Sequence, residues 1–539
     1  MNGKNKIGLN TLGTKMAIFC GIFLVISSCD EGFEEMNQDP NAYLEADIET
    51  LFTTSIIRTV GTGTEDRNRT NIKYLSGAMQ YHATLQDFWY GEKGIVNSQT
   101  GNFFETAYES HLRNLVEILA ATEGNPELIN QNAIAKIWRV YTLHRVTDAY
   151  GDIPYQEGGL GATEGIFKPL YDKQSDIYPW MLEDLEGAID QMDPAAGSFG
   201  SADVIYGGNL DGWRTFAYSL MLRLGMRLTK VDIDLSQEWV QKAIAGGVMQ
   251  GNGDIALLEH SPGHGNTWNW DAFELKRESL PEGNQGTGLV KMAQTFMDIL
   301  QEKDDPRIPF YATLWEGNIN SRQNQVIAET TLPELQQGLP NGYDQGTIDE
   351  VIPNWSSQLL TEYSEPNTAT IANLSTPSII LSYSEVEFLL AEAALRGWAS
   401  GTPQEHYDAA IRANMESTSL FPNNDIEPMA ISTAEIDQYV AENVLSGSVE
   451  EQMEQIHTQF YLAHYMYLDF FEAWSNWRRT GVPELAPITY PLNTTGGEPI
   501  RRLMYSFEEK ALNTQNVEAA ITRQGADTYS TRVWWDVEE

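Results

Sequence analysis

Apolar side chains between residues 213 and 228 repeat at the spacing of an amphipathic α-helix. They stand at i, i+3, i+4, i+7 and onward: Trp213, Phe216, Ala217, Leu220, Leu224 and Leu228. A stripe of this kind is buried against other elements of the fold. This pattern restricts the fold more than any other feature, because similar stretches recur on both sides of it. The chain is therefore predicted to be mainly α.

Elsewhere in the chain, stretches with helical spacing alternate with stretches that have none. The same spacing predicts helices at residues 72–85, 103–121, 132–149, 175–192 and 237–245. From about residue 251 to 376, Gly, Pro, Asn and Trp are frequent, and helical spacing returns only at 289–300. This stretch is predicted to be rich in loops. Hydrophobic residues make up 42% of the 539-residue chain, which is enough for a large core.

A pair of helices is predicted after the irregular stretch. Thr376 and Pro377 suit the start of a helix at residues 378–396, and a second helix follows at 403–415. Small residues stand where these helices would cross: Ala391, Ala393 and Ala394. The pair is similar to a tetratricopeptide-type hairpin.

We therefore expect a degenerate tetratricopeptide-like helical superhelix with the loop-rich region packed on one face. No Pro- or Ser-rich linker separates its parts. The expected division is an N-terminal helical part at 29–250, an irregular part at 251–376 and a C-terminal helical part at 377–539.

The first 28 residues have the layout of a bacterial lipoprotein signal. Three lysines precede an apolar run at 16–26, which is too short to span a bilayer. Residues 26–29, Ile-Ser-Ser-Cys, resemble a lipobox, in which cleavage exposes a cysteine that then receives a lipid. We expect residues 1–28 to be removed and Cys29 to carry the membrane anchor. Cys20 leaves with the signal, so no disulfide can form.

The charge of the chain excludes one class of partner. A net charge of -42 comes from 76 Asp and Glu against 34 Lys and Arg, spread along the whole chain. Such a surface repels phosphate backbones, so no nucleic-acid partner is predicted. The acids otherwise form a solvated surface and identify no ligand.

The sequence contains none of the common catalytic or cofactor motifs. It has no Gly-rich phosphate loop, no Gly-x-Ser-x-Gly elbow and no His-Glu-x-x-His helix. We therefore predict no cofactor, no catalytic residue and no enzyme. A glycosidase stays open as the enzymatic alternative, since paired carboxylates cannot be singled out among so many acids.

Two histidine pairs are the only candidates for a metal site. His260 and His264 lie beside Glu259 in a Pro/Gly-rich segment, where no helix enforces their spacing. His457 and His464 fall in an apolar helical stretch, which favours packing in the core. No metal site is predicted.

Loop aromatics are the candidate ligand-binding residues. Sugars stack on aromatic faces while nearby polar groups bond their hydroxyls, and peptides use similar surfaces. Trp89 and Tyr90 lie in a segment whose glycines indicate an exposed loop after the first predicted helix, and Trp89 is the strongest single candidate. The irregular region adds Trp268, Trp270 and Trp315, with Trp355 as a further loop candidate. Burial in the core is the alternative role for each.

Several sequence blocks, in order, resemble the SusD/RagB family of outer-membrane lipoproteins. They cover residues 33–41 (FEEMNQDPN), 148–155 (DAYGDIPY), 213–227, 305–307 (DPR), 387–393 (EFLLAEA), 471–481 (FEAWSNWRRTG), 499–503 (PIRRL) and 531–536 (TRVWWD). The specificity lies in the ordered set, which spans nearly all of the chain after residue 29. Four tryptophans in these blocks are expected to be structural: Trp474, Trp477, Trp534 and Trp535. Arg501 and Arg502 are expected to pair with carboxylates.

The resemblance implies a function as well as a fold. Proteins of this family are helical, tetratricopeptide-containing lipoproteins of the cell surface that sit over a SusC-like TonB-dependent transporter in the outer membrane. They deliver oligosaccharides to it or, in the RagB branch, peptides, and their recessed ligand surface combines an early loop with the irregular middle region. A surface enzyme and a purely structural or adhesive lipoprotein are the alternatives.

Overall fold

Long helices follow one another along the first half of the described chain. The computed structural model describes residues 47–61, 66–263, 267–279, 289–315, 329–426 and 429–538. The helices of this half are α3 (Ile48–Val60), α4 (Asp66–Arg69), α5 (Tyr90–Lys93), α6 (Asn102–Thr106), α7 (Arg113–Thr122), α8 (Ile129–Tyr150), α9 (Gly161–Glu164), α10 (Gln174–Gln191), α11 (Leu210–Arg227) and α12 (Ile233–Gly246). A π-helical turn, η2 (Ala107–Leu112), joins α6 to α7. The prediction of a mainly helical chain is confirmed.

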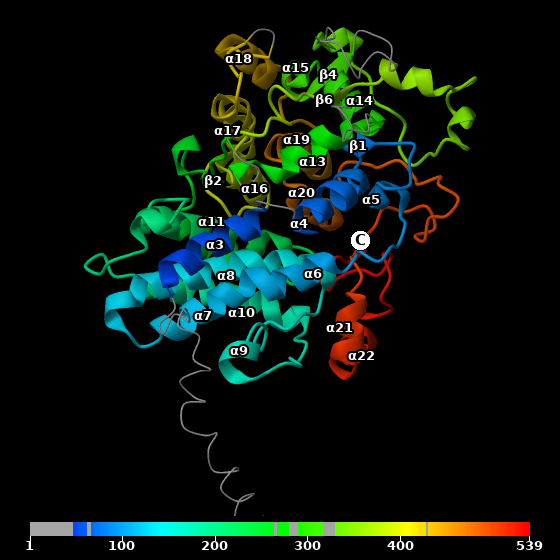
Figure 1. Ribbon diagram of the computed structural model, residues 1–539. Helices are drawn as coiled ribbons and strands as arrows, with labels where there is room; N and C mark the ends of the chain where they lie inside the picture. The colour runs from blue at the N-terminus through cyan, green and yellow to red at the C-terminus, as the bar shows by residue number, and fades with distance from the viewer. Residues whose placement is uncertain are drawn as a thin grey trace, which may run out of the picture. The chain divides into compact units, whose positions relative to one another are not determined.

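Neighbouring helices in this half pack in chain order, as in a solenoid. Contacts run from α7 to α8, α8 to α10, α10 to α11 and α11 to α12, and Figure 1 shows α7, α8 and α10 side by side. The stripe that begins at Trp213 lies in α11, where Trp213, Phe216 and Leu220 are completely buried. The spacing in the sequence therefore identified a buried face correctly.

The C-terminal half is also helical. It contains α16 (Tyr383–Leu395), α17 (Pro403–Glu416), α18 (Thr433–Glu442), α19 (Val449–Tyr467), α20 (Phe470–Thr480), α21 (Phe507–Leu512) and α22 (Thr514–Gln524). The predicted hairpin is formed by α16 and α17, which pack together more extensively than any other pair of elements. Thr402 and Glu405 form a capping box at the start of α17.

The predicted start of that hairpin was wrong. Residues 378–381 form strand β7 (Ser378–Leu381), which pairs antiparallel with β2 (Ala256–Leu258) with Leu257 opposite Ile379. Two adjacent isoleucines favour an extended backbone. The cap of α16 is therefore Ser382, whose hydroxyl accepts the Glu385 backbone N–H at 3.1 Å.

The segment predicted as a helix at 72–85 also differs. It forms a short π-helical turn, η1 (Thr70–Ser76), and then strand β1 (His82–Ala83). Gly77 follows the turn at a point where a Cβ would lie 2.6 Å from the Trp89 ring, and Gln80 has a φ of 53°. A chain that must pass so close to another side chain and then reverse direction cannot continue as a helix.

Short helices and two-residue to four-residue strands make up residues 251–376. The helices are α13 (Trp270–Ser279), α14 (Gln294–Glu302) and α15 (Ile308–Tyr311). Strand β3 (Lys291–Met292) pairs with β1, and β4 (Ala312–Trp315) lies between β5 (Glu329–Thr330) and β6 (Glu365–Pro366). The described residues from Ile48 onward belong to one unit, so the three-part division stays a prediction.

Buried ion pairs join the helices of the two halves. Arg223 and Arg227 of α11 pair with Glu385 of α16 at 2.6 Å and with Glu472 of α20 at 2.7 Å, and all four side chains are at most 2% exposed. Burial would raise the pKa of Glu385, but Arg223 and His464 outweigh it and hold this pKa at about 2. Removing one member of such a pair would leave a buried charge unpaired.

No described helix is both long enough and apolar enough to cross a membrane.

Candidate ligand-binding surface

Three aromatic rings form a cluster at the start of α13. Trp268 stacks on Phe273 with ring centroids 5.4 Å apart and planes 28° apart, and Trp270 lies 4.7 Å from the same phenyl ring. All three side chains are half-buried, so each has area left for a ligand. We call these three residues the ring cluster. Trp268 and Trp270 were predicted ligand-binding residues, and the structure brings them together.

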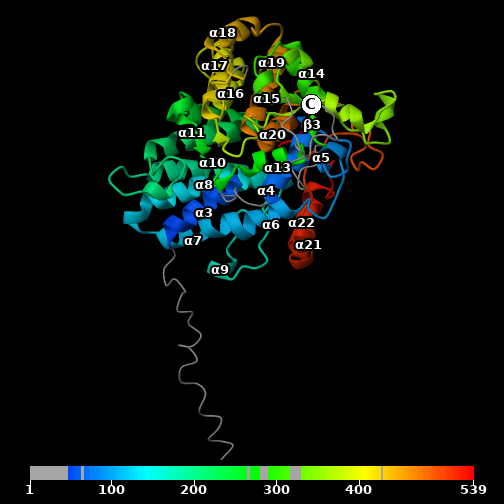
Figure 2. The same cartoon turned by 45° about the horizontal axis from the view of Figure 1, so that its top comes forward.

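The ring cluster is held in place by the backbone that precedes α13. Asn269 is buried between the two tryptophans, and its side chain donates to Thr376 O at 3.0 Å while accepting from Ala272 N at 3.1 Å. In the first turn of α13, Asp271 pairs with Arg67 of α4 and accepts from Asn68 at 3.1 Å. Figures 1 and 2 show α13 beside α4. Trp270 and Phe273 therefore stand on a helix that is fixed from two sides, and Trp268 directly precedes it.

Charged side chains continue this surface along α13. Glu278 accepts from Arg277 at 2.9 Å and from Lys73 of η1 at 3.0 Å, and Arg277 also pairs with Glu274. Among the described residues, no acceptor lies within hydrogen-bond distance of the buried Arg277 Nε. Glu278 stands eight positions after Trp270, or about 12 Å along a helix. Stacking faces and hydrogen-bonding groups thus lie within the length of a short oligosaccharide.

The early aromatic segment reaches this surface through a different residue from the one predicted. Trp89 is completely buried, packed over Gly77 and edge-on to His82, so its predicted exposure on a projecting loop was wrong. The reason is that residues 86–90 fold back against η1. Its neighbour Phe88 is half-buried, meets the Trp89 ring edge-to-face, and lies 5.6 Å from the Lys73 ammonium.

The other predicted ligand residues are not part of the ring cluster. Tyr90 is half-buried and packs on Tyr74, with ring centroids 5.2 Å apart. Trp355 packs beside Tyr363 in a separate small hydrophobic cluster. Trp315 ends strand β4, and its side chain lies outside the described residues, as does Cys29.

The histidines serve packing and hydrogen bonding where they are described. His464 stacks on Phe460 with ring centroids 3.9 Å apart, and His457 is 3% exposed and contacts Glu392, which confirms their place in the core. His260 bonds Ser378 Oγ at 2.8 Å, and burial lowers its pKa to about 4. His264 lies outside the described residues. Over the described ranges, no group of three or more His, Cys, Asp or Glu side chains is placed to hold a metal.

Two further predictions on single residues are confirmed. Arg501 pairs with Asp536 at 3.0 Å and Arg502 with Asp527 at 2.7 Å. The predicted structural tryptophans are buried or partly buried in the core: Trp474, Trp477, Trp534 and Trp535.

Sequence reasoning missed Phe273, Arg277, Lys73 and Phe88. Phe273 could have been found, because it stands three residues after Trp270 and therefore on the same face of a helix. Lys73 reaches α13 through its bond to Glu278, about 200 residues away in the chain, and Phe88 and Arg277 join the surface through Lys73 and Glu278. No local signal reports such contacts.

The fold places the chain among tetratricopeptide-like helical proteins. A family model described as "Starch-binding associating with outer membrane", SusD-like, matches residues 40–506. The chain therefore belongs to the SusD-like family, and the resemblance seen in the sequence blocks is confirmed. No curated protein matches the chain.

Solved structures share this fold over nearly all of their length. A chitin-binding protein is 29% identical, with a TM-score of 0.76, over 91% of this chain and 100% of its own. The Bacteroidetes AC2a SusD-like structure is 25% identical, with a TM-score of 0.79, over 92% and 100%. A chitin-binding SusD homologue from Flavobacterium johnsoniae is 24% identical, with a TM-score of 0.73, over 92% and 99%, and supports the fold alone.

Proposed function

We propose that this chain is a cell-surface protein that captures oligosaccharides and delivers them to a SusC-like TonB-dependent transporter of the outer membrane. The ring cluster on α13 carries the proposal, because stacked aromatic faces beside Arg277, Glu278 and Lys73 match the apolar faces and hydroxyls of a sugar. The name of the chitin-binding relative supports chitin oligosaccharides as the first ligand to test, and the family description supports starch.

Calorimetry with chitohexaose and maltoheptaose tests the ligand and the site together. One of the two sugars should bind, and Trp268→Ala should weaken binding about tenfold or more, since a stacked ring contributes about 0.5 to 1.5 kcal/mol beyond its buried area. Trp355→Ala is the matched control, because this half-buried tryptophan lies in a separate cluster. Unchanged affinity in a folded Trp268→Ala protein would reject the site.

Peptide capture is the second candidate, as in the RagB branch of the family. The charged side chains of Arg277, Glu278 and Lys73 could bind peptide backbone and termini. A mixture of short peptides in the same calorimeter distinguishes the two ligand classes. Binding of peptides with no binding of either sugar would transfer the proposal to peptides.

We also propose that the protein binds rather than transforms its ligand. Incubation of the bound oligosaccharide with the protein should leave its chain length unchanged by chromatography. Release of shorter sugars would establish the glycosidase alternative.

The proposed anchor is the lipid on Cys29. Cys29→Ala should release the protein from the membrane fraction, and persistent attachment would show that the anchor lies elsewhere. Solubilised membranes should yield the wild-type protein together with a TonB-dependent barrel. Purification without such a barrel, under conditions that keep the membrane complex intact, would contradict delivery to a transporter.

A further inference from the structure

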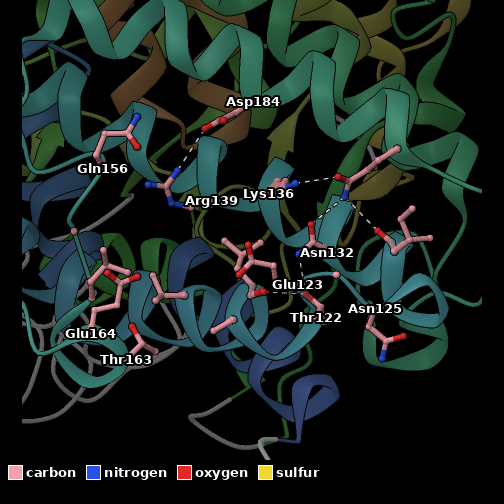
Figure 3. Close-up of a pocket in the computed structure, with 18 of the residues that line it drawn as sticks. Thr122, Glu123, Asn125, Asn132, Lys136, Arg139, Gln156, Thr163, Glu164 and Asp184 are labelled. Atoms are coloured by element: carbon pink, nitrogen blue, oxygen red, sulfur yellow. Dashed lines mark hydrogen bonds and ion pairs between the residues drawn. The ribbon is translucent and has the colours of Figure 1, made fainter.

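A cavity lies among the N-terminal helices, well before the ring cluster in the sequence. It has a volume of about 660 Å³ and is formed by α7, α8, α10 and the segment around α9. Asn132, Lys136 and Arg139 stand at i, i+4 and i+7 on one face of α8 and line it together (Figure 3). Apolar side chains also line it: Val116, Leu119 and Leu160.

A hydrogen-bonded relay joins side chains that line this cavity. Which group donates in each bond follows from the chemistry of its first member. An ammonium can only donate, so Lys136 Nζ donates to Gln191 Oε1 at 2.9 Å. Gln191 Nε2 must then donate to Asn132 Oδ1 at 3.0 Å, and Asn132 Nδ2 to Thr122 Oγ1 at 2.9 Å. The Thr122 hydroxyl ends the relay on the Ile118 carbonyl at 2.8 Å.

The bonds of the relay use its acceptor oxygens and leave N–H donors of Lys136 available to a ligand. Every side-chain oxygen in it already receives a hydrogen bond, whereas Lys136 uses one of its three N–H groups. In the part of the chain that the structure describes, no carboxylate lies within ion-pair distance of Lys136. Its one bonded partner is a neutral amide, although the protein as a whole is strongly acidic.

Arg139 adds a second cation, whose Nη2 donates to the Tyr155 carbonyl and whose guanidinium lies 4.4 Å from the Tyr155 ring centroid, while its one carboxylate contact among the described residues is long. Its Nη1 lies 3.5 Å from Asp184 Oδ2, longer than the 2.7 to 2.9 Å of a charge-assisted hydrogen bond. The same carboxylate oxygen accepts the Tyr155 hydroxyl at 2.5 Å, so Asp184 is shared. Glu123 and Glu164 also line the cavity, but both are exposed and neither forms an ion pair with Lys136 or Arg139.

We infer that this cavity binds an organic carboxylate whose attached group is apolar or presents an apolar ring face. The carboxylate oxygens accept from Lys136 and Arg139, and the attached group lies against Val116, Leu119 and Leu160. Two sources share this chemistry: the carboxyl terminus of a peptide and a uronic acid.

Calorimetry on the wild-type protein tests the inference with two matched pairs of probes. N-acetyl-leucine is compared with N-acetyl-leucinamide, and glucuronate with glucose. At least one acid should bind in the millimolar range or tighter, and its neutral partner should bind at least about tenfold more weakly. The acid that binds identifies the source. Binding of neither acid, or equal binding of an acid and its neutral partner, overturns the inference.

A charge-matched pair of variants locates the site. Lys136→Met keeps the apolar stem and removes the ammonium, and should weaken acid binding about tenfold or more. Lys168→Met removes an equal charge from an exposed lysine outside the cavity and should leave the affinity unchanged. Equal losses in both variants would reduce the effect to general electrostatics and reject the site. If Lys136→Met does not fold, the wild-type comparison of acids with neutral partners still decides.

Discussion

Tryptophans in the helical body and at the start of α13 have opposite environments. Trp213 and Trp474 are completely buried, and their indole N–H groups donate to Asp203 at 2.7 Å and to the Ile500 carbonyl at 2.8 Å. Trp268 is half-buried, and its N–H reaches only the exposed Pro262 carbonyl at 3.3 Å. The first pair has both its apolar and its polar ends satisfied inside the protein.

This difference separates stabilising rings from rings available to a ligand. A buried indole whose N–H has a fixed acceptor contributes area and a hydrogen bond to the fold. The rings of the ring cluster contact one another and are only half-buried. Loss of a ring should therefore reduce stability in the helical body and reduce binding on α13.

The largest expected effect is that of Trp213→Ala. This change removes a completely buried indole and leaves a cavity, so the free energy of unfolding should fall by about 3 to 5 kcal/mol in a urea titration followed by circular dichroism. Phe167→Ala is the control, because its side chain is 80% exposed and its loss should change stability by about 0.5 kcal/mol or less. Similar losses in the two variants would contradict the comparison.

The buried ion pairs give a prediction for acid pH. Burial raises the pKa of Glu385, but Arg223 and His464 outweigh it, so the folded pKa is about 2 against 4.5 for a free glutamate. The unfolded state therefore binds more protons between these values. Glu385 stabilises the fold fully above about pH 4.5, and this contribution, about 3 kcal/mol, is lost as the pH falls towards 2.

Glu385→Gln tests this contribution, because it should change how steeply the free energy of unfolding depends on pH. Between about pH 5 and pH 3, the free energy of unfolding should fall less steeply in the variant, by up to about 1.4 kcal/mol per pH unit. Glu518→Gln, at an exposed position of α22, should keep the wild-type slope. An unchanged slope in Glu385→Gln would show that this carboxylate contributes nothing to acid sensitivity.

A smaller effect is expected from a comparison of two buried tryptophans whose indole N–H groups differ in their hydrogen bonding. Trp213 donates to Asp203, whereas no acceptor lies near the buried Trp89 N–H among the described residues. Trp213→Phe leaves Asp203 without one of its donors and should reduce the free energy of unfolding by about 1 to 3 kcal/mol more than Trp89→Phe. Equal losses in urea titrations would mean that the indole hydrogen bond adds no stability.

Local patterns predicted much of this molecule and failed where distant contacts decide. The periodicity at 213–228 identified a buried helix face because period and burial are properties of one segment. The burial of Trp89 and the partial exposure of Phe88 could not be predicted in the same way. Which of the two rings faces solvent depends on η1 packing behind residues 86–90, and the glycines there indicated a turn without giving its direction.

The candidate site shows the same limit. Trp268 and Trp270 were predicted because they alternate with Asn269 and Asp271 in the irregular region. The charged part of the site could not be predicted, because Lys73 and Glu278 meet only after η1 packs against α13. The predicted helix start at 378–381 was wrong for a related reason: the adjacent isoleucines favour an extended backbone, and the strand β2 that pairs with them lies far away in the chain.

The smallest expected effect is the change in stability of Trp268→Ala, and it is the sharpest test of the comparison. The ring is half-buried, its N–H bonds an exposed carbonyl, and α13 is fixed independently by Asn269 and Asp271. Its loss should therefore lower the free energy of unfolding by about 1 kcal/mol or less, while ligand affinity falls about tenfold. Urea titration and calorimetry on the same preparation separate the two quantities. A loss of stability close to that of Trp213→Ala would place Trp268 among the structural tryptophans, and any fall in affinity would then follow from disruption of α13 rather than from loss of a stacking face.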